Sequence, residues 1–105
     1  MDRINESDWK QWRQIKDQAL NRLCKNILDA VAEVIADESK SPHDRYLGIY
    51  QLIQKRDKDI VLGFDDLRRS NALSKMGMIH SMGFIEPCEL EKFSQETRDF
   101  LKSIT

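Results

Sequence analysis

One uninterrupted stretch, residues 7–36 (SDWKQWRQIKDQALNRLCKNILDAVAEVIA), decides the fold class of this chain. No glycine or proline interrupts it, because the first of either is Pro42. Its apolar residues recur every three or four positions, which at about 100° per residue gathers them on one face of a helix. They are Trp9, Trp12, Ala19, Leu20, Leu23, Cys24, Ile27, Leu28, Val31, Val34 and Ile35. The pattern predicts one long amphipathic helix that begins at Ser7 or Asp8, either of which can cap it.

The length of this helix sets a packing problem. About 28 residues at about 1.5 Å each make a rod of about 42 Å. A compact chain of this size has a diameter of roughly 35 Å. We therefore expect that the helix bends, or that its Trp9/Trp12 end overhangs and packs against something else.

The rest of the chain also predicts helices, and no segment alternates as a strand does. Ser41-Pro42-His43-Asp44 is a helix start, and the second helix runs to Leu62 with Gly63 as its stop, unless it breaks within residues 55–59. A third helix is expected from Asp65 or Asp66 to a left-handed stop at Gly83, with Phe84 folded back on Ile79. Pro87 opens a short helical turn, and a last helix runs from Leu90 to Ile104, with Ser94 as an alternative cap. We predict an all-α, four- or five-helix bundle with a long N-terminal helix, as a single domain over residues 1–105.

Composition narrows the classes of function. The chain has 105 residues, of which 40% are hydrophobic, with 17 basic against 18 acidic residues and a net charge of −1. Such a balance argues against a general electrostatic grip on nucleic acid. The start of the chain lacks the apolar run of a secretion signal, and no stretch is apolar for long enough to span a membrane. Cys24 and Cys88 have no CxxC spacing, so we expect reduced thiols and a cytoplasmic protein without membrane contact.

Catalytic chemistry finds little support. The two histidines, His43 and His80, have no spacing to a nucleophile, and the acids Asp29, Glu33 and Asp37 recur along one side of the first helix as a solvated face does. We expect no catalytic residue, no metal and no cofactor, and favour a non-enzyme.

Asp57 is unusual because it interrupts the apolar stripe of the second helix. A carboxylate buried there would need a cation, which Arg68, Arg69 or Lys16 could supply. We interpret this set as a structural ion pair or, alternatively, as a small-molecule or catalytic pocket.

Two further sets of residues indicate a contact surface. Trp9 and Trp12 lie one helical turn apart, and aromatic residues are favoured at interfaces. Met78 and Met82 point away from Met76 and Ile79, so the third helix is apolar on two sides. The alternatives are that the tryptophans cover the end of the bundle and that the third helix is central. We expect a regulatory or adaptor protein that binds itself, as a homodimer, or another protein through Trp9, Trp12, Met78 and Met82. Nucleic-acid association is the remaining alternative.

Overall fold

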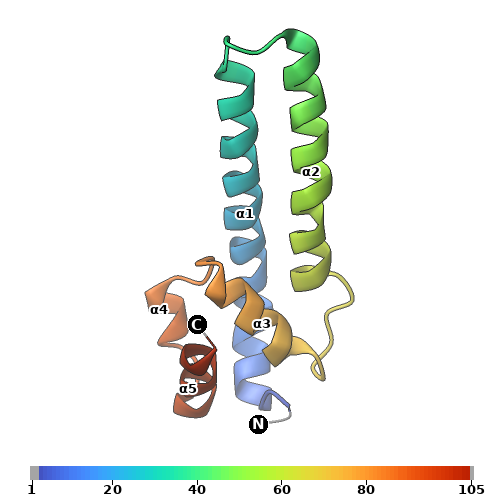
Figure 1. Ribbon diagram of the computed structural model, residues 1–105. Helices are drawn as coiled ribbons and strands as arrows, with labels where there is room; N and C mark the ends of the chain where they lie inside the picture. The colour runs from blue at the N-terminus through green and yellow to red at the C-terminus, as the bar shows by residue number, and fades with distance from the viewer. Residues whose placement is uncertain (1–2, 105) are drawn as a thin grey trace.

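The computed structural model describes residues 3–104 and consists of helices joined by short turns (Figure 1). The helices are α1 (Glu6–Ala36), α2 (Pro42–Phe64), α3 (Ala72–Ser81), α4 (Pro87–Leu90) and α5 (Gln95–Ser103). Within this described range there is no strand, which confirms the all-α class, the five helices and the long first helix. No helix in the same range is both long and apolar enough to cross a membrane.

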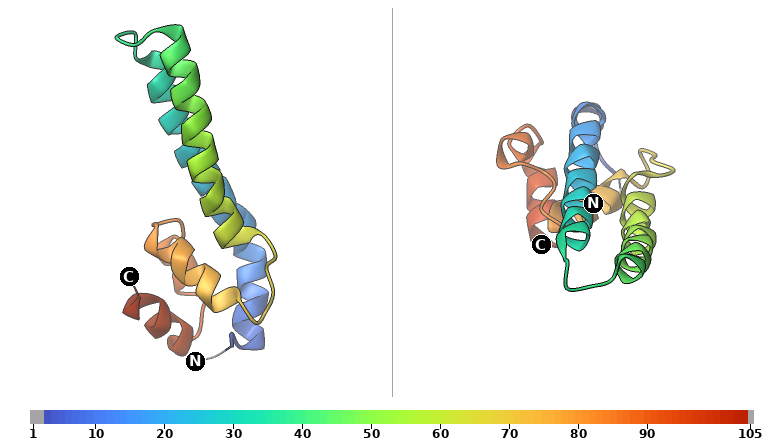
Figure 2. Two further views of the ribbon diagram at one scale, coloured as in Figure 1. Left: turned by 45° about the vertical axis from the view of Figure 1, so that its right-hand side comes forward. Right: turned by 90° about the horizontal axis from the view of Figure 1, so that it is seen from above.

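The helices form two regions that we call the arm and the base. α1 and α2 lie side by side as an antiparallel pair, and α3, α4 and α5 gather around the N-terminal half of α1 (Figures 1 and 2). The base is this lower region, and the arm is the upper part of α1 and α2 beyond it. The molecule measures 51 × 25 × 23 Å and has a radius of gyration of 16.4 Å. A compact chain of about 100 residues has a value near 13 Å, so the arm projects well beyond the base.

The projecting end of α1 is opposite to the one that we expected. Its tryptophan end lies inside the base, and its Ala36 end, paired with α2, extends away (Figure 1). The expectation that the Trp9/Trp12 end overhangs is therefore wrong. The reason is that α3 and α5 return to the N-terminal half of α1, where Trp12, Ile15 and Ala19 provide the side that they cover.

The core belongs to the base. Trp12 has 0% exposure and stacks near Phe64 of α2, with 6.5 Å between ring centroids and 23° between ring planes. Around Trp12 lie the other buried apolar residues of the cluster, which are Ile4, Ile15, Ala19, Ala72, Leu73, Met76, Ile79, Ile85, Phe93 and Leu101. They come from α1, α3, α5 and the turns, so one apolar centre joins both ends of the chain.

A buried acid ties the start of α1 to the start of α5. Asn5, and not Ser7 or Asp8, caps α1, because its side chain accepts the Asp8 N–H at 2.8 Å. This leaves the Asp8 carboxylate, 1% exposed, to accept from Ser94 N at 2.9 Å, Ser94 Oγ at 2.6 Å and Thr97 Oγ1 at 2.6 Å. Burial by itself would raise the pKa of Asp8, but the hydrogen bonds from Ser94, Thr97 and Asn5 outweigh it and hold the pKa below its ordinary value.

An ion pair fastens α4 to α1. Arg22 donates to both carboxylate oxygens of Glu89, at 2.6 and 2.9 Å, and to the carbonyl oxygen of Phe84 at 2.9 Å. Glu89 also accepts the Glu86 N–H at 2.9 Å, which completes the start of α4. Burial favours the neutral acid, yet the hydrogen bonds from Arg22 and Glu86 N prevail and lower the pKa of Glu89.

The turns confirm most of the predicted punctuation. Ser41 caps α2, and the helix has no break at Asp57. It ends at Phe64, one residue past the predicted stop at Gly63. Gly83 has a φ of 86°, and Phe84 N donates to Ile79 O at 3.2 Å, as the predicted left-handed stop requires. Ser94 caps the last helix, so Leu90 belongs to the separate helix α4.

The expected start of the third helix is wrong. α3 begins at Ala72 rather than at Asp65 or Asp66. Asp66 has a φ of 54°, which is not helical, and the Asn71 side chain bonds to Arg68 N and Asp66 O and holds a turn instead. Side chains such as Asn compete with helical hydrogen bonding in this way.

Candidate functional site

The most unusual surface of the molecule is an apolar face along the arm. Five large apolar side chains on it are between 48% and 66% exposed. They are Leu28 and Ile35 of α1, and Tyr46, Tyr50 and Ile53 of α2. We call these five residues, with the half-buried Cys24 and Ile60 next to them on the side of the base, the arm face. Single exposed apolar residues are ordinary on proteins, but a contiguous set of this kind is typical of an interaction site.

The helical repeat explains why this face stays uncovered. Ala19 and Leu28 are nine residues apart on α1, so their side chains point about 180° from each other. Ala19 lies in the core of the base, and Leu28 therefore points away from the base helices. Figure 2 shows α3, α4 and α5 on one side of the helical pair. The packing that builds the base leaves the opposite side of the arm to solvent.

The other side of the arm is more polar, although Leu47 and Leu62 of α2 are exposed there, at 39% and 60%. On α2, Gln51 and Lys55 are exposed and point away from Ile53 by the same helical geometry. On α1, Asn26 and Glu33 are exposed and point away from Leu28 by the same geometry. The large exposed apolar side chains of the arm are therefore concentrated on one side, which is the arm face.

A hollow of about 340 Å³ marks the lower half of the arm face. It is lined by Cys24, Ile27 and Leu28 from α1 and by Ile53, Asp57 and Ile60 from α2. Of these lining residues, Asp57 is the one that carries a charge at neutral pH, and its side chain is exposed. The hollow is a shallow apolar seam between two helices with one carboxylate at its edge.

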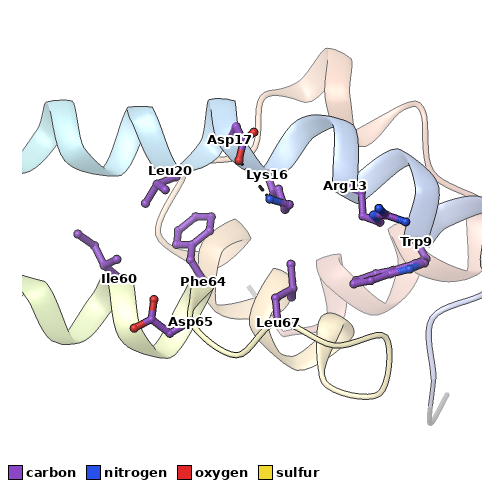
Figure 3. Close-up of a pocket in the computed structure, with 9 residues that line it drawn as sticks. All are labelled: Trp9, Arg13, Lys16, Asp17, Leu20, Ile60, Phe64, Asp65 and Leu67. Carbon is purple, nitrogen blue, oxygen red and sulfur yellow. Dashed lines mark hydrogen bonds and ion pairs between the residues drawn. The ribbon is translucent and has the colours of Figure 1, made fainter.

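A second hollow, of about 360 Å³, continues the seam towards the base and shares Ile60 with the first (Figure 3). In Figure 3, Phe64 projects from α2 between the two helices, and Trp9 lies across from Leu67 at the far end. Arg13 sits over the Trp9 ring, 6.0 Å from its centroid, and Lys16 Nζ is 3.2 Å from the Asp17 carboxylate. The seam between the helices thus continues to the tryptophan end of α1, although four of the nine residues that line this second hollow are charged: Arg13, Lys16, Asp17 and Asp65.

The structure separates the four residues predicted as a partner surface. Trp12 has no exposed area, so a partner cannot reach it while the core is closed. Trp9 is half-buried and lines the second hollow, so it lies at the lower end of the seam. Met78 and Met82 are half-buried on and after α3. Contact through Trp9, Met78 and Met82 stays a prediction.

The predicted set around Asp57 is also dispersed. Arg68 binds Asp66 at 2.6 Å, the Arg69 side chain donates to Ile4 O at 3.1 Å, and Lys16 is beside Asp17. Asp57 lies about two turns before the end of α2, whereas both arginines follow that end, which explains why these side chains find other partners.

The arm face itself was present in the sequence but was assigned to the core. Its residues belong to the apolar stripes of the first two helices, and the first stripe widens from Leu20 onward. A widening stripe indicates more apolar surface than one neighbouring helix can cover. That signal could have identified the arm face before the structure was known.

The titratable groups of the described chain with clearly shifted pKa values are all hydrogen-bonded within the fold. The groups with clearly shifted pKa values are Asp8, Arg22, Asp37 and Glu89, and the hydrogen bond with Glu89 raises the pKa of Arg22. Asp37, at the tip of the arm, has its pKa lowered by hydrogen bonds from Ser39. Between residues 3 and 104 no group of three His, Cys, Asp or Glu side chains is placed to hold a metal ion.

A scan against protein-family models and searches of curated proteins and of solved structures found no match to this chain.

Proposed function

We propose that this protein acts by protein–protein association, as a regulatory or adaptor protein, and that the arm face is its contact surface. The observation that carries the proposal is the row of five large, exposed apolar side chains on one side of the arm. Trp9 extends this surface at the base, in line with the aromatic contact that the sequence suggested.

The energetics of exposure support this function. Removing apolar surface from water contributes about 25 cal/mol per Å², so a covered arm face would be worth several kcal/mol. Tyrosine adds large contact area at low entropic cost, and Tyr46 and Tyr50 are both on this face. The opposite side of the arm, where Leu47 and Leu62 lie among polar residues such as Gln51 and Lys55, offers a smaller gain.

Photo-crosslinking tests the proposal. A photoreactive amino acid replaces Ile53 in one variant and Gln51 in another, since both side chains are exposed on α2 and point to opposite sides of the arm. Irradiation in the native cell should give an adduct of discrete mass from position 53 and none from position 51. Equal adducts from both positions, or no adduct from position 53, would reject the arm face as a contact surface.

A further inference from the structure

The arm face has a midpoint that lies at the same height on both helices. Val34 contacts Gly48, and Arg56 bonds to Asn26 at 2.8 Å, which fixes how α1 and α2 are aligned. By this alignment Leu28 of α1 lies level with Ile53 of α2. Ile35 and Tyr46 then lie about as far above this level as Ile60 lies below it.

We infer that the occupant of the arm face is a second copy of this chain, packed with its arm antiparallel to the first as a four-helix bundle. A two-fold axis crosses the face at the level of Leu28 and Ile53. α1 then faces α1 of the second copy and α2 faces α2. The inference rests on the proposed function and adds to it the identity of the partner and the arrangement.

The size of the arm face fits a second copy. The 23 residues of α2 extend about 34 Å, and two adjacent helices are about 20 Å wide, so two arms overlapped along α2 would cover about 700 Å² of each copy. The arm face, which runs from Tyr46 to Ile60 on α2, makes up about two thirds of this area. A stable protein–protein interface buries about 800 Å² on each partner. A single bound helix would cover only the seam between α1 and α2 and would leave Tyr50 or Leu28 at its edges exposed. Another face of the same width covers both.

The one charge on the arm face also fits this arrangement. Asp57 lies four residues beyond Ile53 on α2, and the two-fold axis brings it level with the position four residues before Ile53 on the second copy. Tyr50 lies one residue, or about 1.5 Å along the helix axis, from that level and is exposed on the same side of α2. Its hydroxyl can donate to the carboxylate, which a covered acid requires. The symmetry supplies this donor twice, once for each Asp57.

Sedimentation equilibrium of the full chain tests the inference. At about 100 µM the wild type should have about twice the 12.3 kDa mass of the chain and should dissociate on dilution. Leu28 is next to its own counterpart, so Leu28→Glu opposes two like charges and should weaken association at least about 100-fold. Leu28→Lys should do the same. Gln51→Glu, on the polar side, should not change it.

Mixing distinguishes a symmetric dimer from other contacts. Equal amounts of Leu28→Glu and Leu28→Lys should form a mixed dimer, because opposite charges then meet at the axis. The pair Ile53→Glu and Ile53→Lys, which is level with Leu28 on α2, provides a second version if the first pair folds poorly by circular dichroism. A monomeric wild type, an unaffected Leu28→Glu variant, or single variants that dissociate without recovery on mixing would each overturn the inference. A monomer that still gives a crosslink from position 53 to a different protein would overturn the dimer alone and leave the proposed function standing.

Discussion

Removal of the Asp8 carboxylate is the perturbation whose effect on stability the structure defines best. Asp8→Ala leaves Ser94 N and Thr97 Oγ1 without the acceptor that they contact at 2.9 and 2.6 Å. Each buried donor without a partner costs about 1–3 kcal/mol, so for two donors we expect a loss of about 2–6 kcal/mol in the free energy of unfolding. Domains of this size have about 5–15 kcal/mol in total, so the variant should be near the limit of folding.

The assay is urea unfolding followed by far-ultraviolet circular dichroism. Wild type and variant are compared at one protein concentration, because self-association would stabilise both by mass action. Glu33→Ala, on an exposed part of α1, is the control and should change the free energy of unfolding by less than about 0.5 kcal/mol. A loss below about 1 kcal/mol for Asp8→Ala would refute the view that this acid joins α1 to α5.

Three further predictions concern the base. Asp8 and Glu89 both have lowered pKa values, so their stabilising contribution is complete above an ordinary carboxyl pKa of about 4 and is lost as the pH falls through the lowered values. The melting temperature should therefore fall in that acid range, and it should fall less steeply with pH in Asp8→Asn. Equal slopes of melting temperature against pH in the two proteins would argue against the assignment. Glu89→Ala removes the acceptor of Arg22 and of Glu86 N and should lower the free energy of unfolding by about 1.5–3 kcal/mol. Amide hydrogen exchange should become faster in α4 than elsewhere in the base. Unchanged exchange in α4 would argue against the role of the Arg22–Glu89 pair in holding α4 on α1. Gly83 has a φ of 86° and open space around its α-carbon, so backbone strain alone should make Gly83→Ala lower the free energy of unfolding by about 1–2 kcal/mol. Gly83→Asn should lower it less, and thermal melts compare the two variants. Equal melting temperatures for both would contradict backbone strain as the cause.

The sequence predicted the helices better than their arrangement, because local signals are written in short segments. Ser41-Pro42 marks a helix start, and Gly83 followed by Phe84 marks a stop, through groups only a few residues apart. The start of α3 was misplaced since Asp65 and Asp66 resemble helix-start residues. The turn is instead decided by the Asn71 side chain, which bonds back to Asp66 and Arg68.

Long-range pairing was outside the reach of local patterns. Asp8 was expected to cap its own helix, and nothing nearby in the chain indicates Ser94 and Thr97, which are 86 and 89 residues away. Likewise, an apolar stripe shows that a face avoids water without showing what covers it. The same pattern placed Ala19 and Leu28 in one class, although the base helices cover only Ala19.

The distance between the two arm tips in solution tests the account most directly. A spin label at Ser39, in a chain with Cys24→Val, which keeps an apolar side chain in the arm face, and Cys88→Ser, reports this distance by double electron–electron resonance. Ser39 is eleven residues from Leu28, so antiparallel arms around an axis at Leu28 place the two labels about 30–35 Å apart. A distance in that range would agree with the proposed dimer. No dipolar signal, or labels closer than about 20 Å as parallel arms would give, would contradict it.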